Sequence, residues 1–222
     1  EEIYPSLRAF FNAWLLPSND RDKDGFPEWA HAMQTGLENA PIYDRWHGGQ
    51  GLDTAYLESP GLAAMLYNEA QHLIKIAKEL GLENDLPALQ QHSDTLRLAV
   101  QSTWDNAAQT YRYRDTFTHF SPSGERILSF SGSGKIKTSF KTQQPQRLIL
   151  FINVPPDSTH NIQVRLYGQT RKGFTTESIA TRQWNWAEKQ AVATSENAFI
   201  AVKQIEVIGL PPEGIGWLST CN

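Results

Sequence analysis

The stretch from Asn19 to Trp46 gathers acidic, aromatic and glycine residues without the periodicity of a helix or a strand. This composition is typical of loops that carry chemistry on a rigid scaffold. Carboxylates give and take protons, indole rings offer flat apolar faces, and amide groups hydrogen-bond to hydroxyl groups. The stretch therefore indicates a site for a sugar.

An Asp-x-Asp-x-Asp-Gly sequence at residues 20–25 matches the first half of an EF-hand calcium loop. The twelfth position of that loop is His31, where an EF-hand has a bidentate glutamate, so the match is incomplete. Two interpretations stay open, a polar turn and a structural Ca²⁺ site. The predicted calcium ligands are four carboxylates and one main-chain oxygen: Asp20, Asp22, Asp24, Glu28 and the carbonyl of Phe26.

The composition of the 222 residues is that of an ordinary globular protein, with 40% hydrophobic and 20% charged residues and a net charge of −4. The sequence contains no run of basic residues, so we expect no nucleic-acid partner. Its apolar runs are too short to cross a bilayer, so we expect no membrane partner. The single cysteine, Cys221, excludes an internal disulfide and leaves the localisation open. The Glu-Glu start and the abrupt end after Asn222 lead us to expect a piece of a longer protein.

Three helices are predicted in the first half, at residues 4–16, 59–81 and 85–104, from apolar residues at helical spacing. Ser59 and Pro60 suit the start of the second helix and Gly81 its end. Asp85 suits the cap of the third, and Trp104 is expected on its buried side. The link at residues 82–84 is short, so these two helices should lie antiparallel.

Strand patterns replace the helical spacing after Thr116, at residues 127–140, 147–154, 161–168, 191–194 and 199–210. Several short strands with turn residues between them predict an antiparallel β-sandwich. The predicted fold is therefore α+β with two domains: a helical part at residues 1–118 and a β-sandwich at residues 119–222.

Several motifs of the helical part resemble the six-hairpin, (α/α)6-barrel glycoside hydrolases, and are most similar to family 63 glucosidases, trehalases and amylo-α-1,6-glucosidase-like debranching enzymes. The motifs are Arg21–Trp29, Gln34–Pro41, Leu52–Leu57, Tyr67–Ala70, Ala77–Gly81, Trp104–Asn106 and Tyr111–Asp115. The resemblance implies hydrolysis of α-glucosidic or related oligosaccharides with no required cofactor. Because a barrel needs twelve helices, it also implies that missing barrel helices or another copy of the chain completes the fold.

The same resemblance implies that Glu38, within Gly36–Pro41, is the general acid, although Glu replaces the usual Asp of this motif. The alternative for Glu38 is a solvated carboxylate at a helix start. The general base has no matching motif after Asp115. The predicted sugar contacts are Trp29, Gln34, Asn39, Trp46 and Asp53. Core packing of the two tryptophans and helix capping by Asp53 are their alternatives.

An alternative interpretation of the whole chain is a non-catalytic carbohydrate-binding or structural module, in which the β-sandwich carries the function. Trp184 and Trp186 are two residues apart and would share one face of a strand. They form either a carbohydrate platform or part of the sandwich core.

Overall fold

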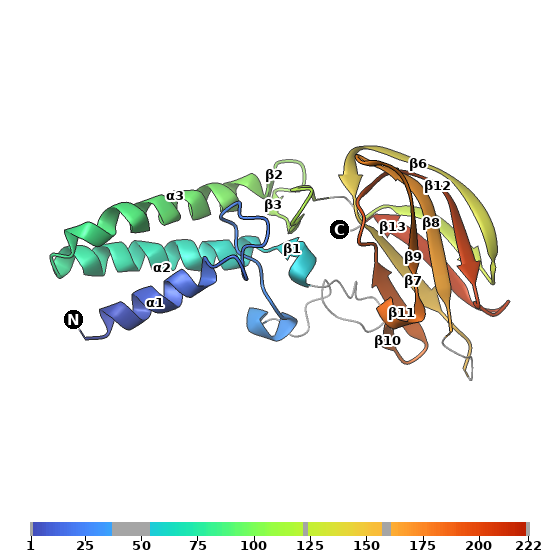
Figure 1. The fold of residues 1–222 in the computed structure, drawn as a ribbon, viewed down its shortest axis with the longest axis horizontal. Coiled ribbons are helices and arrows are strands. Elements are labelled where there is room, and N and C mark those ends of the chain that lie inside the picture. The colour runs from blue at the N-terminus through green and yellow to red at the C-terminus, as the bar shows by residue number, and fades with distance from the viewer. Residues whose placement is uncertain (1, 37–53, 122–123, 157–160, 221–222) are drawn as a thin grey trace. The chain divides into compact units, whose positions relative to one another are not determined.

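The computed structural model describes residues 2–36, 54–121, 124–156 and 161–220, which divide into two compact units (Figure 1). The helical unit contains the described residues up to Phe117, and the β unit contains those from Thr118 onwards. Helices in the first unit and antiparallel strands in the second give an α+β fold, as predicted. The helices in the described residues are too few to show an (α/α)6 barrel.

The helical unit contains three helices, three 3₁₀ turns and four two-residue strands. They are α1 (Tyr4–Trp14), η1 (Ala32–Thr35), η2 (Thr54–Tyr56), β1 (Leu57–Glu58), α2 (Pro60–Glu79), η3 (Glu83–Asp85), α3 (Leu86–Ser102), β2 (Trp104–Asp105), β3 (Thr110–Tyr111) and β4 (Arg114–Asp115). β1 pairs with β4 and β2 with β3, both antiparallel.

The second helix begins and ends as its sequence predicts. The Ser59 hydroxyl accepts a hydrogen bond from the Leu62 N–H at 3.4 Å, and Pro60 occupies the first turn. Gly81 has a φ of 70°, the left-handed conformation that ends a helix. α3 then runs back along α2, and Leu66 and Leu96 belong to the same buried cluster of the helical unit (Figure 1).

Two details of the third helix differ from the prediction. The Asp85 carboxylate does not cap α3; it accepts hydrogen bonds from Tyr4 Oη at 2.9 Å and from Arg8 Nη1 at 2.6 Å, which ties α1 to the start of α3. Trp104 is not buried, because α3 already ends at Ser102. It lies in β2 with 39% of its surface exposed, against the ring of Tyr111.

The β unit contains nine strands in two antiparallel sheets and one 3₁₀ turn, η4 (Thr181–Gln183). The strands are β5 (Arg126–Ser131), β6 (Gly134–Gln146), β7 (Leu148–Asn153), β8 (Gln163–Thr170), β9 (Gly173–Ile179), β10 (Asn185–Ala187), β11 (Gln190–Thr194), β12 (Phe199–Ile208) and β13 (Ile215–Thr220). One sheet has the order β10-β11-β7-β13-β5 and the other the order β6-β12-β8-β9.

A single hydrophobic core lies between these two sheets. Leu150 and Leu218 enter it from the first sheet, and Leu166 and Ile205 from the second, all without measurable exposure. The single strand predicted at 127–140 is two strands of different sheets, because Gly132 has a φ of 60° and turns the chain between them.

Trp184 belongs to this core, where it is 5% exposed and its indole Nε1 donates to the Ile162 carbonyl at 3.1 Å. Trp186 is half-buried and packs against the same core. Of the two alternatives for this pair, the structure therefore supports core packing over a carbohydrate platform. None of the described helices has the length and hydropathy needed to cross a membrane.

The core of the helical unit can be tested with two neighbouring residues of α2, one buried and one exposed. Leu66 is 2% exposed and Met65 is 58% exposed. We expect Leu66→Ala to lower the free energy of unfolding by about 2–5 kcal/mol, because it leaves a cavity. Met65→Ala should cost less than about 1 kcal/mol. Urea denaturation measures both, and equal losses would contradict the described packing.

Candidate functional site

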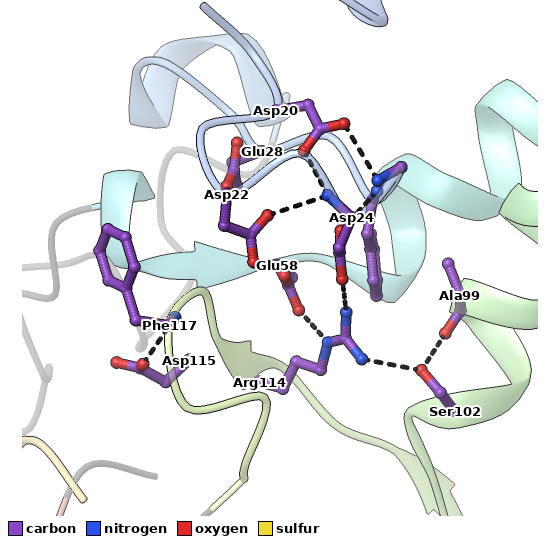
Figure 2. A network of polar contacts seen from close by, with 12 residues as sticks. Asp20, Asp22, Asp24, Glu28, Glu58, Ala99, Ser102, Arg114, Asp115 and Phe117 are labelled. Carbon is purple, nitrogen blue, oxygen red and sulfur yellow. Dashed lines mark hydrogen bonds and ion pairs between the residues drawn. The ribbon is translucent and has the colours of Figure 1, made fainter. Parts of the chain in front are cut away.

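The Asp-rich turn at residues 20–25 lies between α1 and β1 and is closed by its own carboxylates (Figure 2). The Asp20 carboxylate accepts hydrogen bonds from the N–H groups of Asp24 at 3.1 Å and Gly25 at 3.0 Å. Gly25 has a φ of 84°, and a Cβ there would lie 2.5 Å from Thr95 Cγ2 on α3. Glycine is required here by both the backbone conformation and the close approach of the helix.

The remaining two aspartates of the turn are oriented by main-chain groups. Asp24 Oδ1 accepts from the Phe26 N–H at 2.8 Å, and Asp22 Oδ1 accepts from the Asp24 N–H at 3.4 Å. Figure 2 shows the Asp22 side chain directed toward Glu58 on β1 and the Asp24 side chain directed toward Arg114 on β4. The turn therefore presents carboxylate oxygens to the paired strands β1 and β4.

Glu28 is the buried carboxylate next to this turn, with 1% of its surface exposed. Its Oε2 accepts from the Arg21 N–H at 3.2 Å, and its buried Oε1 has no hydrogen-bond partner among the described residues. Burial raises the pKa of Glu28 to about 7, and the nearby Asp22 and Asp20 charges act in the same direction. A group with this environment favours either a proton or a bound cation.

Glu58 joins the cluster from β1, where it forms a β-bridge with Glu28 and pairs with Arg114 of β4. Its carboxylate, which is fully buried, forms an ion pair with Arg114 Nε. Burial raises the pKa of Glu58 to about 9, and the Arg114 charge opposes that shift. Sequence reasoning missed Glu58 because it lies thirty residues beyond Glu28, outside any calcium-loop spacing.

Oxygen atoms of Asp22, Asp24 and Glu58 lie within 4.8 Å of one another. These three donors of the helical unit are hard oxygens, which suit Ca²⁺. Glu28, whose buried Oε1 has no hydrogen-bond partner among the described residues, is bridged to Glu58 through the main chain. The residues present therefore fit a divalent cation. Arg114 supplies positive charge to the same cluster, since its Nη2 lies 2.5 Å from Asp24 Oδ2.

Two of the predicted sugar contacts lie within the helical unit. Trp29 is 7% exposed and meets the Trp14 ring edge-on, with 5.5 Å between ring centroids. Gln34 Oε1 accepts hydrogen bonds from the N–H groups of Ala30 and His31, which closes the η1 turn. Trp29 thus packs in the core of the helical unit and Gln34 closes a local turn, and sugar contact by either of them stays a prediction.

A protein-family model for the mannosylglycerate hydrolase MGH1-like glycoside hydrolase domain matches residues 1–185, which is most of the chain. The chain belongs to this glycoside hydrolase family. The match confirms the glycoside hydrolase part of the sequence resemblance and supports a glycosidase-related function. No curated protein matches the chain.

The predicted acid of this MGH1-like chain, Glu38, lies outside the described residues, as do Asn39, Trp46 and Asp53. Their roles rest on the sequence alone. Gly36 is the last described residue before them and has a φ of 65° at the end of η1.

The environment of Glu28 predicts how the stability of this MGH1-like chain depends on pH in the absence of metal. The folded state holds the Glu28 proton up to a pKa of about 7, whereas the ordinary value is 4.5. The folded state therefore binds more protons between these values, and stability falls as pH rises through this window. Glu28→Gln should flatten the decline in thermal melts with EDTA. Glu79→Gln, at an exposed position of α2, should follow the wild type. Identical profiles for wild type and Glu28→Gln would contradict the buried, unpaired state of this carboxylate.

Proposed function

We propose that the chain is part of a glycoside hydrolase that cleaves α-glucosidic or related glycosidic bonds by acid/base hydrolysis. The observation that carries the proposal is the family match over residues 1–185, which includes the Gly36–Pro41 motif. The family description names mannosylglycerate hydrolase, so mannosylglycerate belongs among the glycosides to test. The finer placement near family 63 glucosidases, trehalases and debranching enzymes rests on the motif resemblance.

Glu38 is the proposed general acid, which protonates the glycosidic oxygen as the bond to the sugar breaks. A general acid must keep its proton until it meets that oxygen, so burial in the complete site is expected to raise its pKa. The proposed general base lies outside the chain. In an inverting enzyme it would stand about 6.5–9.5 Å from the acid and leave room for a water molecule.

The helices are proposed to be hairpins of an (α/α)6 barrel that further helices or another copy of the chain complete. In support of this proposal, the apolar face of α1 is only partly buried. Phe11 is buried, but Leu7 and Phe10 are 40% and 59% exposed. Ile3 is 69% exposed just before the helix. Exposed apolar residues that gather in this way are typical of a surface that another element covers.

The Asp-rich turn is proposed to hold a structural Ca²⁺. Asp20, Asp22, Asp24, Glu28 and the Phe26 carbonyl are the ligands that the sequence predicts, and Glu58 is the addition that the structure suggests. The ion would neutralise carboxylates that are costly to bury as charges. Its role would be to hold the turn against β1, since hydrolysis by two carboxylates requires no metal.

Replacement of the proposed acid tests the catalytic part. Glu38→Gln keeps the shape of the side chain and removes its proton. In the intact protein this change should lower kcat on glycosides with poor leaving groups at least ~100-fold. An activated aryl glycoside should lose far less, because its leaving group needs little protonation. Glu79→Gln, on the exposed surface of α2, is the matched control and should leave both rates unchanged. Unchanged rates in Glu38→Gln would remove Glu38 from the mechanism.

Thermal unfolding with Ca²⁺ and with EDTA tests the cation site. A Kd ten times below the calcium concentration would stabilise the folded chain by about 1.4 kcal/mol, so the melting temperature should rise. Asp22→Asn should lose most of this rise, because an amide is a weaker ligand than a carboxylate. Asp94→Asn, at an exposed position of α3, should keep it. Equal melting temperatures at millimolar Ca²⁺ and in EDTA would contradict the site.

A further inference from the structure

The outer face of the four-stranded sheet carries a concentration of positive charge that the sequence does not show as a run. Residues 118–222 hold eleven lysine and arginine residues against seven aspartate and glutamate residues, although the whole chain has a net charge of −4. Five of these cations lie on the strands of this sheet: Lys135, Lys137, Lys141, Arg165 and Lys203. We call this face of the sheet the basic face.

Strand register places these cations on the same face of the sheet. Lys135 of β6 pairs with Glu206 of β12, which pairs with Arg165 of β8. The next row of paired residues on this face contains Lys137 of β6, Gln204 of β12 and Tyr167 of β8. Residues paired across neighbouring strands point to the same face and lie about 5 Å apart. The cations therefore share one face across three strands, with Glu206 between Lys135 and Arg165.

Glu206 is the one carboxylate that the four strands direct to this face within the described residues. It accepts a hydrogen bond from Tyr167 Oη at 2.8 Å and pairs with Arg165 at 3.2 Å and with Lys135 at 3.5 Å. The other acidic residue on these strands, Glu177, is 7% exposed and accepts from the N–H groups of Glu196 and Asn197. Lys137, Lys141 and Lys203 form no ion pair with any described residue.

Protection of a sheet edge explains only part of this arrangement. Lysines on an edge strand prevent pairing with other chains, and β6 is an edge strand. Lys203 and Arg165, however, lie on β12 and β8, the two inner strands of the sheet. Lys203 occupies a bulge, where the register shifts between Val202 and Gln204, and its Nζ lies 5.9 Å from the ring of Phe174. A bulge re-aims a side chain, and here it presents a lysine next to an exposed aromatic ring.

Neutral side chains between the cations indicate the kind of ligand. Gln204, Tyr167 and Thr176 form one row across β12, β8 and β9, and their amide and hydroxyl groups can hydrogen-bond to sugar hydroxyls. Phe174 is 64% exposed and offers an apolar surface for the C–H face of a sugar ring. One face of a glycoside hydrolase thus combines cations, groups that hydrogen-bond to hydroxyls and an exposed aromatic ring. This combination favours an acidic glycan over a nucleic acid as the ligand.

We propose that the basic face binds an acidic polysaccharide, with Lys137, Lys141 and Lys203 contacting its carboxylate or sulfate groups. Binding there is independent of hydrolysis and of Glu38, so its test is separate from that of the proposed function.

The test is isothermal titration of the 222-residue chain with polygalacturonate, heparin, neutral dextran and a single-stranded DNA oligonucleotide. Polygalacturonate and heparin distinguish carboxylate from sulfate as the anionic group. We expect binding to at least one acidic glycan, none to dextran, and weaker binding as salt shortens the Debye length from about 14 Å at 0.05 M to about 6 Å at 0.3 M.

The double variant Lys137→Gln/Lys203→Gln should bind about tenfold more weakly, because it removes two cations that contact the polymer. Among the described residues it breaks no hydrogen bond or ion pair and removes only the surface contact of Lys203 with the Phe174 ring, so it should fold normally. The control Lys75→Gln/Lys78→Gln removes the same charge from exposed positions of α2 and should change binding less than about twofold.

Three outcomes would overturn the proposal. They are the absence of glycan binding at low salt, an equal loss in both double variants, and binding of the oligonucleotide that is tighter than that of either acidic glycan. Light scattering adds a fourth. A salt-sensitive dimer that Lys137→Gln/Lys203→Gln abolishes would assign the basic face to a second copy of the chain.

Discussion

The helical unit depends on one half-buried arginine. Arg114 of β4 pairs with Glu58 of β1 and Asp24 of the turn, and its Nη1 donates to Ser102 Oγ at 3.2 Å at the end of α3 (Figure 2). Its guanidinium also lies over the Phe26 ring, 4.8 Å from the centroid. A planar guanidinium with five donors can serve several acceptors at once, which an ammonium cannot do as well. Three segments distant in sequence are thereby held together around one cation.

This arrangement also explains why so many carboxylates can gather in a small volume. A buried charge is costly unless it is paired, and loss of one partner of such a pair costs about 3–5 kcal/mol. Arg114 compensates Glu58 and Asp24, main-chain N–H groups compensate Asp20, and one oxygen of Glu28 remains without a described partner. This buried Glu28 oxygen, next in the chain to the Asp-rich turn, is the physical basis for the proposed Ca²⁺.

The sequence predicted the parts of the fold that local signals determine. Ser59, Pro60 and Gly81 set the ends of α2, and the antiparallel α2–α3 pair follows from the short link between them. The α+β order and the regions of most β-unit strands were also predictable from periodicity. The strands β9, β10 and β13 were not predicted. In β9 and β13, Thr175 and Gly216 interrupt an apolar alternation, and only pairing with neighbouring strands defines these two strands.

The candidate site was predictable only where its residues are close in sequence. The Asp-rich turn shows a known spacing, whereas Glu58 and Arg114 enter it through strand pairing across 56 residues. The basic face was not predictable from the sequence for the same reason. Its lysines alternate with residues whose side chains point into the core, and they come from different strands. Trp184 shows the converse: two tryptophans with platform spacing proved to pack into the core.

The central claim, that this chain carries the acid of a glycosidase, is tested most directly by affinity labelling of the intact protein. A bromoacetyl glucosylamine places an alkylating group where the glycosidic oxygen would lie, so it should esterify the carboxylate that acts as acid. Mass spectrometry of the digested protein is predicted to find the label on Glu38, and an excess of glucoside should prevent the reaction. Labelling of a different carboxylate, with Glu38 unmodified, would contradict the account.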